Sequence, residues 1–236
     1  MQIPVLAYHK IDEPTSDIKL RGAFTSPKNF ARQMRYLKRQ NYKFYTASEL
    51  IDFYLENGAF PARAITLTFD DGWKDNYTNA FPIMKELGIR ATIFLVSSCI
   101  GKRSAKVVAD GEGEREHLAL EDILEMSEYG IEFGSHTLNH KLLHQVPDEE
   151  VEFEVTESKK EIENLLQKPC RVFAYPAGFC TAAAQNAVKR AGYVAAFSTV
   201  YGDRENVNLY ALNRIEILRR NWFLFQFART IKPLRS

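Results

Sequence analysis

Two neighbouring carboxylates are the side chains of this sequence most suited to chemistry. Asp70 and Asp71 directly follow the alternating apolar run at residues 64–69. Because like charges this close raise the pKa of one of the two groups, the pair calls for a cation beside it. His136 and His140 lie four residues apart, a spacing that on a helical turn brings both imidazoles to one side. Two imidazoles and one carboxylate would form a site for a divalent metal ion, with positions left for water, and the second carboxylate would stay free to act as a base.

A third histidine continues the same spacing. His144 lies four residues after His140 and is a candidate further ligand. We favour the alternative that His144 is a solvent-facing residue of the helix that follows. A lone HxxxH pair is weak support for a metal site, and the pair gains weight here only because an aspartate from another strand end can join it.

The elements that must position these residues follow from hydrophobic periodicity. Strand-sized apolar runs alternate with amphipathic helical stretches over nearly the whole chain. The strand candidates are residues 3–8, 43–46, 64–69, 90–96, 131–134, 171–175, 193–198 and 212–217. Strands that alternate with helices predict a mostly parallel sheet, and about eight of them predict an α/β fold of the distorted (β/α) barrel type with seven to eight strands. With 236 residues and 45% hydrophobic content, we expect a single domain over residues 1–236.

Helix boundaries are visible at several places. Ser26 followed by proline begins one helix, Ser48 is a candidate cap of a second that ends at Gly58, and residues 147–168 form a long third helix with acidic residues in its first turn. Residues 97–116 fit no regular element. A loop of this length in a compact domain is usually functional or mobile.

Polar residues follow four of the predicted strands. In a barrel of this type the chemistry gathers at the C-terminal ends of the strands, where the connecting loops converge. We therefore expect four groups of residues to share one rim, namely His9, Asp70 with Asp71, His136 with His140, and residues 175–178.

Charge and cysteine content exclude several classes of protein. The 31 basic and 30 acidic residues leave a formal charge of +1, which favours no nucleic acid and no anionic membrane as a partner. Three cysteines without a CxxC spacing predict free thiols rather than a disulfide framework or a structural zinc cluster. No signal peptide or membrane span is visible near the N-terminus. The compartment stays open: extracellular or cell-surface if a leader was removed, otherwise cytoplasmic.

The residues at the rim resemble the polysaccharide deacetylases of carbohydrate esterase family 4, the NodB-homology domain. TFDDG at 68–72 resembles the first motif of that family, SHTLNH at 135–140 the second and FAYPAG at 173–178 the third. The resemblance extends from about residue 3 to residue 217. It implies removal of N-acetyl groups from an amino-sugar glycan by a divalent ion, zinc first, with Co²⁺, Ni²⁺ or Fe²⁺ as alternatives. It assigns Asp71, His136 and His140 to the metal, Asp70 to the catalytic base, and the backbone N–H of Ala177 to the oxyanion.

Two departures from the family pattern need replacements. The third motif of the family carries an arginine that orients the base, but Ala174 stands there, so Arg171 and Arg214 are candidates and we favour Arg214. The late histidine that protonates the leaving amine is missing, because no histidine follows His144. We expect His9 to supply this general acid, since the first strand of a closed barrel lies beside the last. With an early Tyr-His pair at residues 8 and 9 and a third motif that reads FAYP, the chain is similar to the branch of poly-β-1,6-N-acetylglucosamine deacetylases.

Aromatic residues near the strand ends are candidates for contacts with sugar rings. Trp73, Tyr175 and Tyr201, together with Pro176, are the substrate-binding residues we expect, and we expect Trp73 and Tyr201 to be exposed. The apolar tail at residues 221–232 ends with basic residues and has two interpretations. It is either a membrane-surface helix or a final helix packed on the barrel, and we favour the packed helix.

Three functions remain open on these residues. The first is a metal-dependent deacetylase of a glycan such as poly-N-acetylglucosamine, chitin or peptidoglycan. The second is a carbohydrate-binding module that has lost its activity. The third is a deacetylase of a lipid-linked amino sugar, or a hydrolase of a non-sugar amide.

Overall fold

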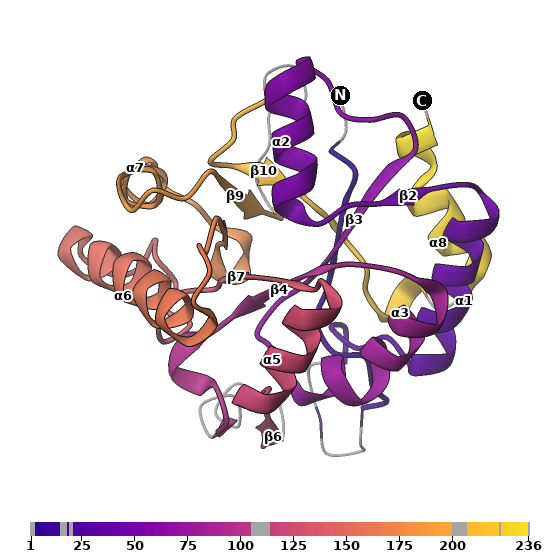
Figure 1. Cartoon of the computed structure of the whole chain (residues 1–236), viewed down its shortest axis with the longest axis horizontal. Helices are drawn as coiled ribbons and strands as arrows, with labels where there is room; N and C mark the ends of the chain where they lie inside the picture. Colours follow the sequence, from indigo (N-terminus) through magenta and orange to yellow (C-terminus); the bar gives the residue numbers. More distant parts are fainter. Residues whose placement is uncertain are drawn as a thin grey trace.

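A nearly closed barrel of parallel strands forms the centre of the molecule, as the computed structural model shows (Figure 1). The structure describes residues 3–14, 18, 21–104, 114–199, 207–221 and 223–235. Neighbouring strands follow the order β10-β9-β8-β7-β4-β3-β1-β11. Their bounds are β1 (Val5–Tyr8), β3 (Ala64–Phe69), β4 (Thr92–Leu95), β7 (Glu132–Ser135), β8 (Val172–Ala174), β9 (Ala195–Ser198), β10 (Leu212–Asn213) and β11 (Ile215–Glu216). The predicted single-domain α/β barrel is confirmed.

The barrel closes through one short stretch of chain. The last predicted strand is split into β10 and β11, which are separated only by Arg214. β10 pairs with β9, whereas β11 pairs with β1, with Leu6 opposite Ile215. The N–H of Arg214 donates to the Ser198 carbonyl at 2.9 Å. The first and last strands are therefore neighbours, as predicted, and Arg214 sits at the junction.

One predicted barrel strand has a smaller role. Only the short β2 (Lys43–Phe44) forms within residues 43–46, and it pairs with the start of β3 outside the main strand order. Within residues 97–116, the short strands β5 (Arg103–Ser104) and β6 (Arg115–Glu116) pair as an antiparallel hairpin. The segment also begins with a short 3-10 helix, Ser97–Cys99. The expectation of no regular element there is thus wrong for these three pieces, and residues 105–113 lie outside the described part of the chain.

Seven α-helices surround the barrel in the described residues (Figure 1). They are α1 (Pro27–Arg39), α2 (Ala47–Asn57), α3 (Phe81–Leu87), α5 (Leu120–Tyr129), α6 (Asp148–Leu166), α7 (Ala182–Arg190) and α8 (Leu224–Thr230). Ser26 caps α1 and Gly58 ends α2 with a φ of 68°, both as predicted. The cap of α2 is Thr46 rather than Ser48. Thr46 forms a capping box with Glu49, and this reciprocal pair satisfies two backbone N–H groups at once.

The apolar tail packs on the barrel, as we favoured. Phe227 and Ile231 are fully buried, and the Phe227 ring meets the Tyr36 ring of α1 edge to face. Phe223 and Phe225 at the start of α8 are exposed, at 58% and 68%. No helix in the described part of the chain is long and apolar enough to span a membrane. Membrane association of the tail stays a prediction that we do not favour.

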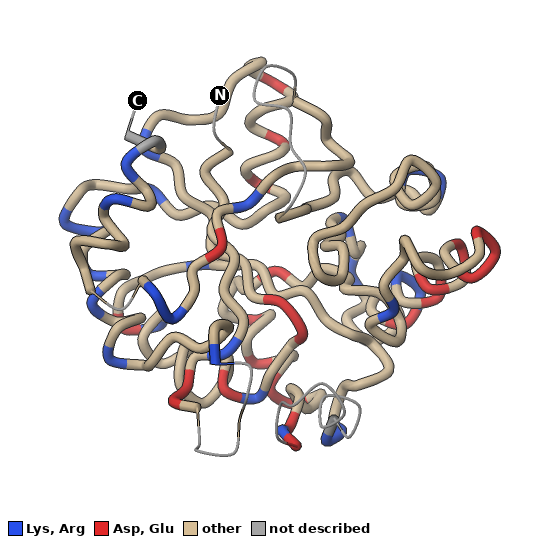
Figure 2. Tube along the Cα trace, turned by 180° about the vertical axis from the view of Figure 1, so that it is seen from behind, with Lys and Arg blue, Asp and Glu red and all other residues tan. Residues whose placement is uncertain are grey.

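The near-zero net charge conceals a segregation of charge. Lys and Arg gather along α1 and the C-terminal segment, whereas Asp and Glu gather along the start of α6 (Figure 2). α1 carries five basic residues and no acidic one, and the first turn of α6 has three acidic residues.

The three cysteines are free, as predicted.

Candidate active site

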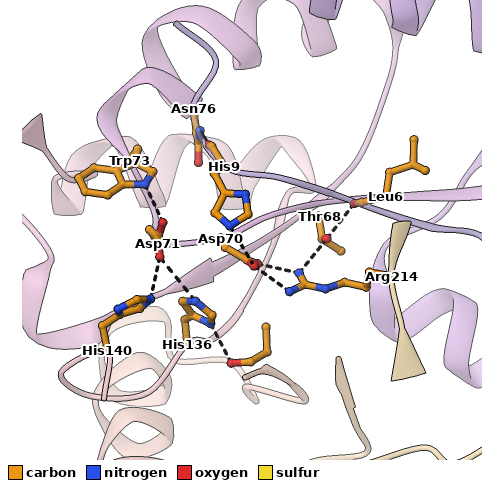
Figure 3. Close-up of polar contacts among 11 residues, drawn as sticks. Leu6, His9, Thr68, Asp70, Asp71, Trp73, Asn76, His136, His140 and Arg214 are labelled. Carbon is orange, nitrogen blue, oxygen red and sulfur yellow. Dashed lines mark hydrogen bonds and ion pairs between the residues drawn. The ribbon is translucent and has the colours of Figure 1, made fainter. Parts of the chain in front are cut away.

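A sharp turn after β3 sends the two aspartates in different directions (Figure 3). Asp71 has a φ of 73° and Gly72 a φ of 66°, both in the left-handed region. The φ of Gly72 favours glycine, and a Cβ there would lie 2.7 Å from a terminal carbon of the Leu95 side chain, which would have to shift. The turn directs Asp71 toward the two histidines that follow β7 and leaves Asp70 facing Arg214.

Asp71, His136 and His140 come together as one group (Figure 3). Asp71 Oδ1 lies 3.5 Å from His136 Nε2 and 3.3 Å from His140 Nε2, and the candidate ligand atoms are all within 4.8 Å of one another. One oxygen and two imidazole nitrogens are a donor set that suits zinc and similar first-row ions. These three residues therefore form a candidate metal centre.

The protonation states of His136 and Asp71 also suit a metal. His136 Nδ1 donates to the Ala174 carbonyl at 2.8 Å, which leaves Nε2 to face Asp71. Burial lowers the pKa of His136 to about 4, so its imidazole is neutral at neutral pH. Burial raises the pKa of Asp71, but the hydrogen bond and charge of His140 outweigh burial and place that pKa well below its ordinary value. Asp71 is therefore ionised.

The histidine pair is carried by a loop, not by the helical turn that its spacing suggests. Thr137 and His140 have φ values of 67° and 56°. The loop is tied to α6, because the Glu154 side chain accepts hydrogen bonds from the Asn139 backbone N–H and side-chain amide, each at 2.8 Å. These contacts, rather than helical periodicity, bring the two imidazoles together.

His144 takes no part in the group. It is exposed, as we expected, but lies in the loop before α6 instead of in the helix. Its ring centroid is 4.9 Å from that of Phe179.

Asp70 is held by Arg214 through two hydrogen bonds. Arg214 donates from two nitrogens to the two Asp70 oxygens, each at 2.7 Å, and also to Thr68 Oγ1 at 3.1 Å. Both partners of the ion pair are buried. Burial raises the pKa of Asp70, but the charge and the hydrogen bonds of Arg214 lower it below its ordinary value. The alternative candidate, Arg171, instead binds Asp52 on α2 at 2.6 and 2.7 Å.

His9 reaches the same site from the end of β1. Its Nε2 lies 3.9 Å from Asp70 Oδ2, and 22% of its side chain is exposed. Asn76 Nδ2 donates to the His9 carbonyl at 2.9 Å, which anchors the loop after β1. His9 Nδ1 is buried and has no hydrogen-bond partner among the described residues.

The predicted sugar-stacking residues are mostly buried. Trp73 is 2% exposed, so the prediction that it is exposed is wrong. Tyr175 is fully buried and donates its hydroxyl to the Tyr210 carbonyl at 2.9 Å, and Pro176 is buried as well. These rings fill the space beneath the strand ends and offer no open face to a sugar. Tyr201 lies outside the described residues.

Ala177 stands at the end of β8, where the third motif places it. It is exposed and has a φ of 54°. Its place at the rim agrees with the expected position of an oxyanion donor, and that role stays a prediction.

One residue of the site has no signal in the sequence. His117 Nδ1 donates to the Asp71 carbonyl at 2.9 Å, and its ring stacks on Trp73 with centroids 4.3 Å apart. His117 follows β6, far along the chain from any motif. No spacing rule links it to the aspartates, because the contact arises from the way the long loop folds back.

The fold and the site together define an α/β-barrel protein with a candidate divalent metal centre at its strand ends. A sequence profile of the family described as polysaccharide deacetylase matches residues 57–196, more than half of the chain. The chain belongs to the polysaccharide deacetylase family, and its resemblance to carbohydrate esterase family 4 is confirmed.

Individual relatives agree with this assignment. YxkH of Bacillus subtilis, named as a polysaccharide deacetylase, is 29% identical over 217 residues, which cover 92% of this chain and 71% of YxkH. The poly-beta-1,6-N-acetyl-D-glucosamine N-deacetylase of Staphylococcus aureus strain N315 is 26% identical over 193 residues. That match covers 78% of this chain and 64% of the staphylococcal protein, less than two thirds of its length. The solved structure of Streptococcus pyogenes deacetylase PplD in complex with acetate has 28% identity and a TM-score of 0.77, covering 92% of this chain and 93% of PplD.

Proposed function

We propose that this deacetylase is a metal-dependent hydrolase that removes N-acetyl groups from N-acetylglucosamine-type glycans. The observation that carries the proposal is that the two neighbouring aspartates have different partners. Asp71 Oδ1 lies within 3.5 Å of two imidazole nitrogens, whereas Asp70 is bound by Arg214. One carboxylate is thus available to a metal ion and the other to a proton.

Asp71, His136 and His140 would hold the ion, for which Zn²⁺ is our first choice. When bound, it supplies a Lewis acid for the acetamide carbonyl and a lowered pKa for water. The neutral imidazole of His136 and the ionised Asp71 are in the protonation states that binding requires.

Asp70 acts as the general base in this proposal. Arg214 keeps it ionised and fixes the plane of its carboxylate, so a proton from the attacking water finds an acceptor in a defined place. Each carboxylate oxygen has a second lone pair beyond the one used by Arg214. The Ala177 N–H is the donor we assign to the developing oxyanion.

His9 is the residue we assign to protonation of the leaving amine. It is partly exposed at the rim, and its Nε2 lies 3.9 Å from the base. Among the described residues outside the candidate metal centre, His9 is the one histidine with a ring nitrogen within 4.0 Å of an Asp70 oxygen. An amine leaves poorly without a proton, so some such donor is required.

The substrate is an N-acetylated glycan, of which poly-β-1,6-N-acetylglucosamine, chitin-like and peptidoglycan-like chains are the candidates. The match to the staphylococcal enzyme favours the first. A lipid-linked amino sugar is the alternative within the same chemistry. A non-catalytic carbohydrate-binding module is the alternative outside it, and the presence of the complete site in one place weighs against it.

Acetate release tests the proposal. We expect no release from N-acetylglucosamine oligomers after treatment with a chelator, and release after Zn²⁺ or Co²⁺ is restored. Asp71→Asn should lose the response to metal, whereas Asp52→Asn, which changes a partly exposed aspartate on α2 that pairs with Arg171, should keep it. Saccharide binding without acetate release under all conditions would support the module instead. Comparison of β-1,6-linked, β-1,4-linked and lipid-linked substrates identifies the preferred class.

A further inference from the structure

We infer that Trp73 is a positioning residue, whose indole N–H holds Asp71 in the orientation of a one-oxygen metal ligand. The inference rests on the proposed metal dependence. It assigns a role to a side chain that the sequence suggested as a sugar-stacking platform and that the structure buries.

The two oxygens of Asp71 have different partners (Figure 3). Trp73 Nε1 donates to Oδ2 at 2.8 Å, whereas Oδ1 faces the Nε2 atoms of His136 and His140. A free carboxylate can rotate and bind an ion through one oxygen or two. With Oδ2 engaged by the indole, only Oδ1 is presented to the candidate metal position.

The indole is itself firmly held. Its ring stacks on the His117 imidazole at an interplanar angle of 26°, and Lys10 Nζ lies 4.5 Å from the ring centroid. Trp73 and His117 form an antiparallel bridge, and the Leu118 N–H donates to the Gly72 carbonyl at 2.8 Å. His117 Nδ1 also donates to the Asp71 carbonyl. The segment that carries His117 and Leu118 therefore supports both the backbone and, through Trp73, the side chain of Asp71.

This arrangement has a chemical consequence. A catalytic metal site needs coordination positions that the protein does not fill, so that water and the substrate carbonyl can enter. An aspartate limited to one oxygen leaves one more such position than an aspartate that binds through both. Partners of this kind orient metal ligands, and their loss typically lowers metal affinity about 10- to 100-fold.

Trp73→Phe tests the inference, because it keeps a ring against His117 and removes only the N–H. We expect the Kd for Zn²⁺, measured by competition with a chromophoric chelator, to rise about 10- to 100-fold. The visible absorption of the Co²⁺-loaded protein should change in intensity, since that intensity depends on coordination number. Tyr129→Phe is the matched control: it also removes one hydrogen bond from a packed ring, the one from its hydroxyl to the Met84 carbonyl, without touching Asp71. It should leave both measurements unchanged.

A measurement on the unmodified ring covers the case in which Trp73→Phe does not fold. The chain has two tryptophans, so the ¹H–¹⁵N spectrum should contain two indole signals, and Trp222→Phe identifies the one from Trp73. Added Zn²⁺ should shift the Trp73 signal, because its acceptor is the ligand itself. Failure of the native protein to bind Zn²⁺ overturns the proposed function. Native binding of Zn²⁺ with an unmoved Trp73 signal, or with an unchanged Kd and Co²⁺ spectrum in Trp73→Phe, overturns this inference alone.

Discussion

At the scale of single residues, the site works by giving two adjacent carboxylates different surroundings. Asp70 is paired with a buried guanidinium, and Asp71 faces two imidazoles. Without these partners, two neighbouring carboxylates would raise the pKa of one of the two. Each partner lowers the pKa of its own aspartate, so both can be ionised at once.

His9→Ala is the first prediction at this scale. We expect turnover to fall about 100- to 10,000-fold, the range of a lost general acid, while Zn²⁺ affinity is kept. Acetate release and chelator competition measure the two effects separately. A variant that keeps most of its turnover with metal bound would exclude His9 as the acid.

Asp75 gives a prediction about pH. It is buried after the first motif and accepts a hydrogen bond from the Ile11 N–H at 2.8 Å. Burial raises its pKa from 3.8 to about 6. The folded state therefore retains a proton that the unfolded state loses, and the stability this contributes below the unfolded pKa is lost as pH rises through the folded value.

Asp75→Asn removes this titration and keeps an acceptor for Ile11. The free energy of unfolding of the native protein relative to the variant should fall by about 2 kcal/mol between about pH 4 and pH 7, at 1.36 kcal/mol per pKa unit. Urea denaturation at a series of pH values measures it. The comparison with the variant is needed because His136, with its pKa lowered by burial to about 4, titrates in the same window with the opposite sign. A pH-independent difference would contradict the prediction.

At the scale of elements, helices outside the barrel fix the loops that carry the ligands. Glu154 of α6 is fully buried and accepts two hydrogen bonds from Asn139, and its own carbonyl accepts one from the Leu138 N–H at 3.2 Å. Ser158 of the same helix contacts Ser135 at the end of β7, Oγ to Oγ at 2.7 Å. The geometry of the histidine pair is therefore set by α6 as much as by its own strand.

Glu154→Gln should loosen this loop. The substitution replaces one carboxylate oxygen by an NH₂ group, which would face an N–H donor of Asn139 instead of accepting from it. The free energy of unfolding should therefore fall by about 1 to 3 kcal/mol, and the affinity for Zn²⁺ should fall with it. Glu161→Gln, an exposed position on the same helix, is the control and should change neither quantity. Denaturation and metal titration of both variants decide the matter. Equal affinity in all three proteins would mean that α6 does not position the ligands.

At the scale of the whole molecule, closure of the barrel and assembly of the site depend on the same residue. Arg214 lies between β10 and β11, where one segment joins β9 to β1, and its side chain crosses to Asp70 after β3. The ion pair thus links the last strands to the third. Because both charges of the ion pair are buried, removing one of them would leave the other buried without a partner, which destabilises the folded state.

Arg214→Met should be strongly destabilising, by about 3 to 5 kcal/mol, because it leaves a buried carboxylate without its partner. Arg171→Met is the matched control. Arg171 makes an equally close two-oxygen contact with Asp52, but that pair is more than one third exposed and its loss should cost about 0 to 1 kcal/mol. Adding Asp70→Asn to Arg214→Met should restore part of the stability. Equal losses in the two arginine variants would contradict the importance of burial.

Much of this protein follows from its sequence alone, because the relevant signals are local. The alternation of strands and helices predicts the barrel, and the ends of the predicted strands place Asp70, Asp71, His136 and His140 at one rim. The apolar residues of a strand or of a helix face recur with a period of a few residues, so this pattern can be recognised in the sequence without the tertiary structure. The caps at Ser26 and Gly58 are local in the same way.

Other features were decided only when distant segments met. Both Arg171 and Arg214 belong to strand regions, and only the closure of the barrel directs Arg214, not Arg171, toward Asp70. Trp73 follows a rim motif, yet His117 from the far end of a long loop covers it. The histidine pair has the spacing of a helical turn, yet α6 holds it as a loop. The direction of a side chain and its exposure depend on contacts between residues far apart in the chain, and local periodicity carries no information about those contacts.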